Sequence, residues 1–202
     1  MAGDGTRRRP ARERLLEAAD ELMFVDGVVL TPVDVILKRA GAAPATLYTN
    51  FGNKDGLIAA ALRRRLAEWT AAWDEAIAEA DGPIDRLLAI FPALRDYQHT
   101  RLHERWCAFS GTAAAVYQPT EEVAAALHAE EELLGDRMLE YATEVVGPER
   151  APVLADQVTT AYFGTLVGML RRDQDRAILG GEATARAIID ALLAEGVSGR
   201  AS

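Results

Sequence analysis

The sequence lacks the features that mark disulfide-stabilised, membrane-spanning and secreted proteins. A single cysteine, Cys107, among 202 residues excludes an intramolecular disulfide framework. No apolar run approaches the roughly 18 residues that a membrane-spanning helix requires. The basic residues of Met1–Arg14 are not followed by the apolar segment of a secretory signal. Together these absences predict a protein of the reducing cytoplasm.

Positive charge is scarce, but it is unevenly distributed. The net charge is −9, which at first argues against a nucleic-acid partner. Residues 1–66, however, carry 11 Lys and Arg against 8 Asp and Glu, whereas the rest of the chain carries 11 against 23. This asymmetry favours a polyanion-binding part on an acidic body. The alternative is an ordinary acidic surface behind a disordered basic tail, which we expect over residues 1–10.

Strand signals are also missing, and the residue usage predicts an all-α fold. No stretch shows sustained alternation of β-branched residues, while the strong helix formers Ala, Leu, Glu and Arg dominate. Gly-Pro and Gly-Gly pairs are expected to separate helices, and Pro92 to kink or split one of them. The expected helices cover about residues 11–25, 32–40, 44–51, 54–80, 83–98, 102–117, 120–146, 150–173 and 182–195.

Two of the expected short helices are joined by Gly41-Ala42-Ala43, the spacing of a helix-turn-helix. Thr31 can cap the first of them. In the second, which Pro44 opens, Leu47 and Phe51 are four residues apart and can anchor it to a core. Hairpins of this kind also occur in all-α proteins that never touch DNA.

The exposed side of that second helix suits DNA. Ala45, Thr46 and Thr49 are small enough to let the helix approach base edges. Thr46 and Tyr48 offer hydroxyls to phosphates, and Lys54 stands at the start of the next helix, where the dipole favours an anion. We therefore list as candidate DNA contacts Thr31, Pro44, Ala45, Thr46, Tyr48, Thr49 and Lys54.

The segment from about residue 12 to 60 resembles the N-terminal domain of the TetR/AcrR family of transcriptional regulators. The most distinctive part is Thr-Leu-Tyr-x-x-Phe-x-x-Lys, here Thr46 to Lys54. The resemblance implies a three-helix DNA-binding domain over residues 11–60 and a helical effector-binding and dimerisation domain over 61–202. It also implies that Thr46, Tyr48 and Lys54 contact DNA. Ala43 departs from the pattern, because alanine cannot accept the amide hydrogen bonds of a helix cap.

The C-terminal part offers only candidate residues for effector binding. Bulky aromatic side chains could line a pocket for a small, largely apolar molecule, although each could equally fill the core. These candidates are Trp69, Trp73, Phe91, Tyr97, Trp106, Phe109, Tyr117, Tyr141 and Tyr162.

Two further patterns in this part invite a functional interpretation. His99, His103 and Cys107 recur every four residues, but on one straight helix the first and last would lie about 12 Å apart, too far for one zinc ion. We therefore expect no metal site and no cofactor. Gly164-x-x-x-Gly168 permits close helix packing, either at a dimer interface or within one subunit.

The function expected from these features is that of a repressor. It would bind a palindromic operator in double-stranded DNA as a homodimer and release it on binding an effector, without membrane association. The dimer is expected through residues 150–173 and 182–195, a four-helix interface of Val158, Tyr162, Leu166, Met169, Ile188, Ile189, Leu192 and Leu193. An enzyme is the first alternative, but no phosphate loop, HExxH or G-x-S-x-G occurs. A protein-binding scaffold is the second, and it would not require the Thr46–Lys54 motif.

Overall fold

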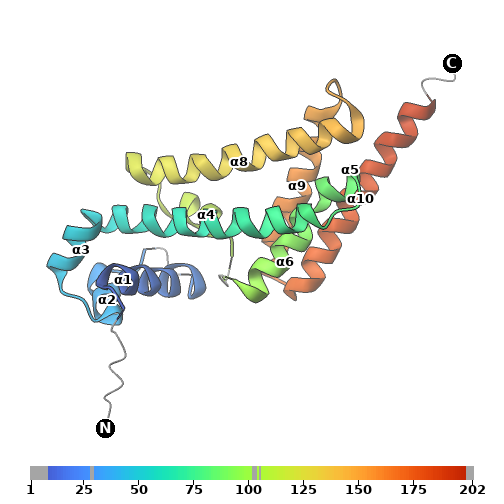
Figure 1. Ribbon diagram of the computed structural model, residues 1–202. Coiled ribbons are helices and arrows are strands. Elements are labelled where there is room, and N and C mark those ends of the chain that lie inside the picture. The colour runs from blue at the N-terminus through green and yellow to red at the C-terminus, as the bar shows by residue number, and fades with distance from the viewer. Residues whose placement is uncertain (1–8, 28–29, 102–103, 105, 199–202) are drawn as a thin grey trace, which may run out of the picture. The chain divides into compact units, whose positions relative to one another are not determined.

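The computed structural model describes residues 9–27, 30–101, 104 and 106–198, and every regular element in these ranges is a helix (Figure 1). The all-α prediction is therefore confirmed. In chain order the elements are α1 (Ala11–Asp20), the π-helical turn η1 (Glu21–Val25), α2 (Val33–Ala40), α3 (Pro44–Phe51), α4 (Lys54–Ala78), α5 (Pro83–Leu88), α6 (Ile90–Thr100), α7 (Ala108–Ala115), α8 (Glu121–Val146), α9 (Ala151–Met169) and α10 (Gln174–Ser198).

The helices belong to two compact units. The N-terminal unit comprises Met1–Arg64 and Ala108–Leu127, and the C-terminal unit comprises Arg65–Cys107 and His128–Ser202. The sequence predicts one boundary after residue 60, and nothing in it marks α7 and the start of α8 as parts of the first unit. The start of α8 packs on α4 within this unit, because a Cβ atom added at Gly56 of α4 would lie 3.2 Å from the Glu122 carboxylate.

Proline splits one helix as predicted. Pro92 has no N–H to donate to the carbonyl of Leu88 four residues earlier. Accordingly α5 ends at Leu88 and α6 begins at Ile90.

The expected helix over residues 102–117 is wrong at its start. Glu104, Trp106 and Cys107 are not helical, and α7 begins only at Ala108. A tertiary contact competes with helix formation here, because Glu104 is buried against Arg65. His99 and Cys107 thus do not share a helix, and His103 lies outside the described residues.

The break expected at Gly180-Gly181 is also wrong, because α10 runs through both glycines. Of the two, Gly181 serves close packing of α10 against α9 instead. A Cβ atom on Gly181 would collide with the Thr165 hydroxyl and lie 3.0 Å from the Phe91 ring. On the same surface Gly168, the second glycine of the Gly-x-x-x-Gly pattern, lies against Ala177. That glycine therefore packs two helices of one chain together.

We expect Gly181→Ala to lower the free energy of unfolding by about 1–3 kcal/mol, because the added methyl group overpacks a tight helix crossing. Gly180→Ala is the matched control, since a Cβ there meets nothing within 4 Å. It should be neutral or stabilise by up to about 1 kcal/mol, because alanine favours a helix over glycine. Urea unfolding of both variants measures the difference, and equal effects would contradict the packing argument.

The structure also corrects most of the dimer face that the sequence predicts on α9. Val158, Tyr162, Leu166 and Met169 are all at most 5% exposed. They face the core of their own chain, because the apolar side of α9 packs on α10. On α10, Ile189 is likewise buried, whereas Ile188, Leu192 and Leu193 are half-buried.

Candidate nucleic-acid interface

The helix-turn-helix lies in the N-terminal unit and forms with the bounds predicted for its second helix. α2 is followed by Gly41, whose φ of 56° and ψ of 44° place it in the left-handed region that glycine adopts without steric cost. α3 then begins at Pro44 and is followed by Gly52, which also has a positive φ, of 75°. At the other end, α2 begins one residue later than predicted, at Val33, a shift within the usual variation of helix ends.

The missing cap at Ala43 is partly offset by the backbone itself. Ala43 makes no side-chain cap bond, as expected. Pro44 has no N–H that would need a partner, and the Thr46 N–H donates to the Ala43 carbonyl at 2.9 Å. The Asn50 side-chain amide adds a hydrogen bond of 2.7 Å to the Thr46 carbonyl. The departure from the family pattern therefore leaves α3 intact.

α3 buries one side and presents the other. Leu47 is 1% exposed and anchors the helix, as predicted. Phe51 is half-buried, with the Arg12 guanidinium 5.4 Å above its ring, a favourable cation–π distance. The opposite side exposes Pro44, Ala45, Tyr48, Thr49 and Asn50, with Thr46 half-buried beside them.

The residues at the two ends of the candidate interface differ in how far they reach solvent. Asn53 caps α4, because its Oδ1 accepts the Gly56 N–H at 2.8 Å. Lys54, the first residue of α4, is half-buried. Thr31, in contrast, is only 4% exposed, so its side chain is largely screened from any ligand.

Charged contacts that the sequence does not reveal brace the helix-turn-helix. The Arg14 guanidinium donates to the Gly41 carbonyl at 3.3 Å, joining α1 to the turn. The Arg39 Nε donates to Glu21 at 2.9 Å, joining α2 to η1. Residues so far apart in the chain carry no common pattern, and only the tertiary structure brings them together.

The comparison with known families matches this same segment. The model for bacterial regulatory proteins of the tetR family matches residues 15–61, from α1 into the first turns of α4. The chain belongs to the TetR family. That family consists of regulatory proteins and not of enzymes.

Sequence relatives match this TetR-family chain over part of its length. The HTH-type transcriptional regulator YvkB of Bacillus subtilis is 39% identical over 54 residues, which are 27% of this chain and 29% of YvkB. The regulator BetI of Brucella suis biovar 1 is 35% identical over 79 residues, 39% of this chain and 40% of BetI. The matches thus span less than half the length of either relative.

Solved structures extend the likeness in fold to most of the TetR-family chain. A TetR-family transcriptional regulator from Streptomyces coelicolor superposes with a TM-score of 0.77 at 21% identity, covering 89% of this chain and 94% of that one. The reduced form of E. coli NemR gives a TM-score of 0.69 at 19% identity, covering 88% and 95%. At these identities the likeness shows the fold alone.

The predicted effector-binding aromatics are only partly brought together. In the C-terminal unit, the Trp69 ring lies 5.7 Å from those of Trp73 and Tyr97 and 6.2 Å from that of Tyr162. Phe91 joins them, 6.4 Å from Tyr162. These five side chains, which we call the aromatic cluster, are each at most 7% exposed, and burial raises the pKa of both tyrosines.

The other aromatic candidates lie elsewhere. Phe109 and Tyr117 belong to the N-terminal unit, where Phe109 is buried and Tyr117 is 94% exposed. Trp106 and Tyr141 are half-buried in the C-terminal unit. The sequence alone does not show whether a given aromatic side chain will be buried, half-buried or exposed.

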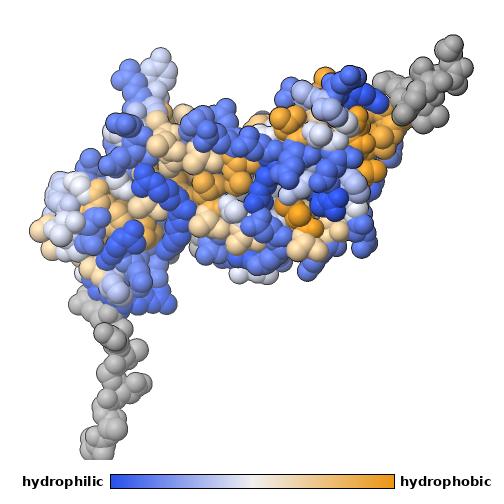
Figure 2. Space-filling model, turned by 45° about the horizontal axis from the view of Figure 1, so that its top comes forward, coloured by the Kyte–Doolittle hydropathy of each residue, from blue (hydrophilic) through white to orange (hydrophobic). Residues whose placement is uncertain are grey.

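Three pockets of the C-terminal unit have linings without aromatic residues. Two of them, of about 270 and 260 Å³, share Ala76, Glu79 and Pro92, so both lie against the second half of α4. The third, of about 450 Å³, lies along α9 and α10 and is lined by the small residues of their crossing. Figure 2 shows apolar residues reaching the surface next to the C-terminal end of α10.

Among the helices of the described residues, none contains an apolar stretch of the length that a membrane span requires.

Proposed function

We propose that this TetR-family protein is a DNA-binding transcriptional repressor. It would act as a homodimer on a palindromic operator and release it when a small molecule binds the C-terminal unit. The observation that carries the proposal is the two-sided α3: Leu47 is buried, while Pro44, Ala45, Tyr48 and Thr49 face solvent. A short helix with small exposed side chains is what major-groove recognition requires.

The exposed residues divide between two tasks. Thr46, Ala45 and Thr49 would face bases, because they lie on the helix that enters the groove. Tyr48, 61% exposed, and Lys54 would contact phosphates. A lysine is a point charge without base-reading geometry, and at the start of α4 it adds to the helix dipole. The buried Thr31 would act by supporting the start of α2.

We expect Lys54→Ala and Thr46→Ala to weaken operator binding in different ways. Lys54→Ala should weaken binding to all DNA sequences equally, because one phosphate contact is lost. The slope of log K against log salt concentration should become less steep by roughly one unit per DNA-binding domain. Thr46→Ala should narrow the gap between operator and scrambled DNA by about 1 kcal/mol or more. Binding of both variants to the upstream region of the protein's own gene, at several salt concentrations, measures the difference.

Wild-type protein that binds no upstream duplex more tightly than a scrambled one would overturn the proposed function. An unchanged salt slope in Lys54→Ala would contradict the division of tasks alone. Circular dichroism controls for the fold of Thr46→Ala, since the Thr46 backbone holds the first turn of α3.

The homodimer would form through the exposed side of α9. Phe163 and Val167 of this helix, and Leu170 directly after it, are 44–49% exposed, and Leu179 of α10 is 54% exposed. Apolar side chains at such spacing on neighbouring helices suit a second copy of the same surface, since homodimers usually form isologous interfaces.

We expect Val167→Arg to convert the dimer to a monomer, because the isologous contact would bury two unpaired cations. Operator affinity should then fall at least tenfold, an order-of-magnitude figure for losing the second half-site. Leu139→Arg is the matched control, being 45% exposed on α8, and should remain dimeric. Sedimentation velocity at micromolar concentration reports both, and a wild-type monomer would refute the dimer.

The effector would bind against the second half of α4 in the C-terminal unit. Trp69 and Trp73 lie on this half, and the two pockets that share Ala76 border it. α4 also supplies Lys54 to the DNA interface, so a ligand that prefers one position of α4 alters DNA affinity through its differential affinity for the two states. Tryptophan fluorescence during a screen of candidate effectors measures binding at this place.

A further inference from the structure

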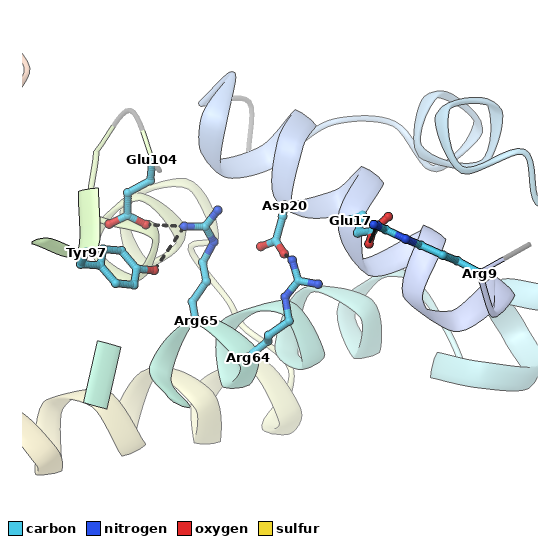
Figure 3. Close-up of polar contacts among 7 residues, drawn as sticks. All are labelled: Arg9, Glu17, Asp20, Arg64, Arg65, Tyr97 and Glu104. Carbon is cyan, nitrogen blue, oxygen red and sulfur yellow. Dashed lines mark hydrogen bonds and ion pairs between the residues drawn. The ribbon is translucent and has the colours of Figure 1, made fainter. Parts of the chain in front are cut away.

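Two adjacent arginines of α4 make ion pairs in different units. The boundary between the units falls between Arg64 and Arg65. Arg64 pairs with Asp20, the last residue of α1, within the N-terminal unit. Arg65 pairs with Glu104 within the C-terminal unit, its Nη1 lying 2.8 Å from the carboxylate. Figure 3 shows the two guanidinium groups directed at these separate partners.

The pair in the N-terminal unit lies at the brace of the helix-turn-helix. Asp20 is 5% exposed, so its negative charge must be stabilised by protein groups rather than by water. The next residue, Glu21, begins the π-helical turn η1 and holds Arg39 of α2. Single π-helical turns are uncommon and occur frequently at functional sites. Arg64 therefore ties α4 to the point at which α1 meets α2.

The pair in the C-terminal unit is more deeply buried. Arg65 is 0% and Glu104 6% exposed. The same Nη1 of Arg65 lies 3.4 Å from the Tyr97 hydroxyl, and the Glu104 N–H donates to the Gln98 side chain at 3.2 Å. Glu104 stands between α6 and α7, outside any helix, so these side chains take the place of helix hydrogen bonds in holding it.

Consecutive residues of one hydrogen-bonded helix cannot move independently. Each residue is related to the next by a fixed rise of about 1.5 Å and about 100° of rotation. A change at Glu104 that moved the backbone at Arg65 would therefore also move the backbone at Arg64 and act on the ion pair of Arg64 with Asp20.

We propose that Arg64 and Arg65 are positioning residues that couple Glu104 in the C-terminal unit to the α1–α2 brace of the DNA-binding helices. This proposal rests on the proposed function and names the side chains through which that function would be regulated. It requires that the ion pairs of Arg64 and Arg65 depend on each other, which a double-mutant cycle measures directly.

The experiment compares full-length wild type, Glu104→Gln, Arg64→Met and the double variant. Amide hydrogen exchange without DNA is followed over residues 18–25. Glu104→Gln should accelerate this exchange at least about threefold, and should add nothing in the Arg64→Met background. In operator binding, the double variant should depart from the product of the single effects by at least about threefold.

Two controls keep the test decisive. Glu144→Gln removes an ion pair with Arg86 in the same unit, and should leave exchange over residues 18–25 unchanged. If Glu104→Gln fails to fold, Tyr97→Phe perturbs the same Arg65 Nη1 more mildly and should act in the same direction. Thermal unfolding establishes which variants are folded.

Independent effects of the two substitutions, or no effect of Glu104→Gln on residues 18–25, would overturn the coupling. Failure of the wild type to bind DNA would refute the proposed function and leave the exchange measurement to decide the coupling by itself.

Discussion

Arg65→Met is expected to lower the free energy of unfolding by about 3–5 kcal/mol, which is the usual cost of leaving one member of a buried ion pair without its partner. Glu104 is 6% exposed, so in this variant its carboxylate would remain buried, where water solvates its charge poorly. Chemical denaturation followed by circular dichroism measures the loss.

The companion variant Arg65→Met/Glu104→Leu separates charge from packing. If the cost comes from the unpaired carboxylate, removing both charges should recover most of the lost stability, because apolar replacements of buried ion pairs are often neutral. Arg86→Met is a matched control, since Arg86 pairs with Glu144 at 2.6 Å where both side chains are over 30% exposed. It should cost less than about 1 kcal/mol. A double variant as unstable as Arg65→Met alone would assign the effect to packing.

Glu130→Gln is expected to stabilise the protein at pH 8 by about 3 kcal/mol. Burial, with a smaller effect from neighbouring Glu131, raises the pKa of Glu130 to about 7 from its usual 4.5. The negative charge of Glu130 also helps to raise the pKa of the buried Tyr162 hydroxyl. At pH 8 the folded protein therefore carries an ionised carboxylate in an unfavourable place, and a shift of this size corresponds to about 3 kcal/mol.

The sign of the pH dependence follows from the raised pKa. Below pH 4.5 Glu130 is protonated in both states, and between about pH 4.5 and 7 the folded state holds the proton more tightly. This contribution to stability is complete below pH 4.5 and is lost as the pH rises through 7. From pH 5 to 8 the wild type should lose about 2–3 kcal/mol relative to Glu130→Gln.

Glu131→Gln serves as the control, because the Glu131 side chain is 82% exposed. It should keep most of the pH dependence of the wild type, because burial raises the pKa of Glu130 more than the charge of Glu131 does. Urea unfolding at pH 5, 6, 7 and 8 compares the three proteins, and parallel curves for wild type and Glu130→Gln would refute the raised pKa.

Much of the candidate DNA interface could be predicted from sequence because its determinants are local. The bounds of α3 follow from Pro44 at its first position and Gly52 after its last. Its buried side follows from the four-residue spacing of Leu47 and Phe51. The Asn53 cap of α4 depends only on residues three positions apart. In each case the interacting groups lie within one or two helical turns, where sequence order dictates distance.

The structure of the C-terminal unit is harder to predict from sequence, because the residues that determine it are distant from one another along the chain. The aromatic cluster joins α4, α6 and α9, and nothing in the sequence separates its members from the exposed Tyr117. Periodicity predicts a dimer face on the side of α9 that the structure buries, since it identifies an apolar side but not what covers that side. The raised pKa of Glu130 likewise depends on neighbours brought in by folding.

The all-α class, the helix-turn-helix and the split at Pro92 follow from the order of the amino acids, because helix propensity, caps and the missing N–H of proline act within a few residues. The continuation of α10 through Gly180 and Gly181 depends instead on contacts between distant segments. So do the place of α7 in the N-terminal unit and the non-helical conformation of Glu104, which pairs with Arg65. In these cases close packing, or the pairing of a buried charge, outweighs a local preference of about 1 kcal/mol per residue.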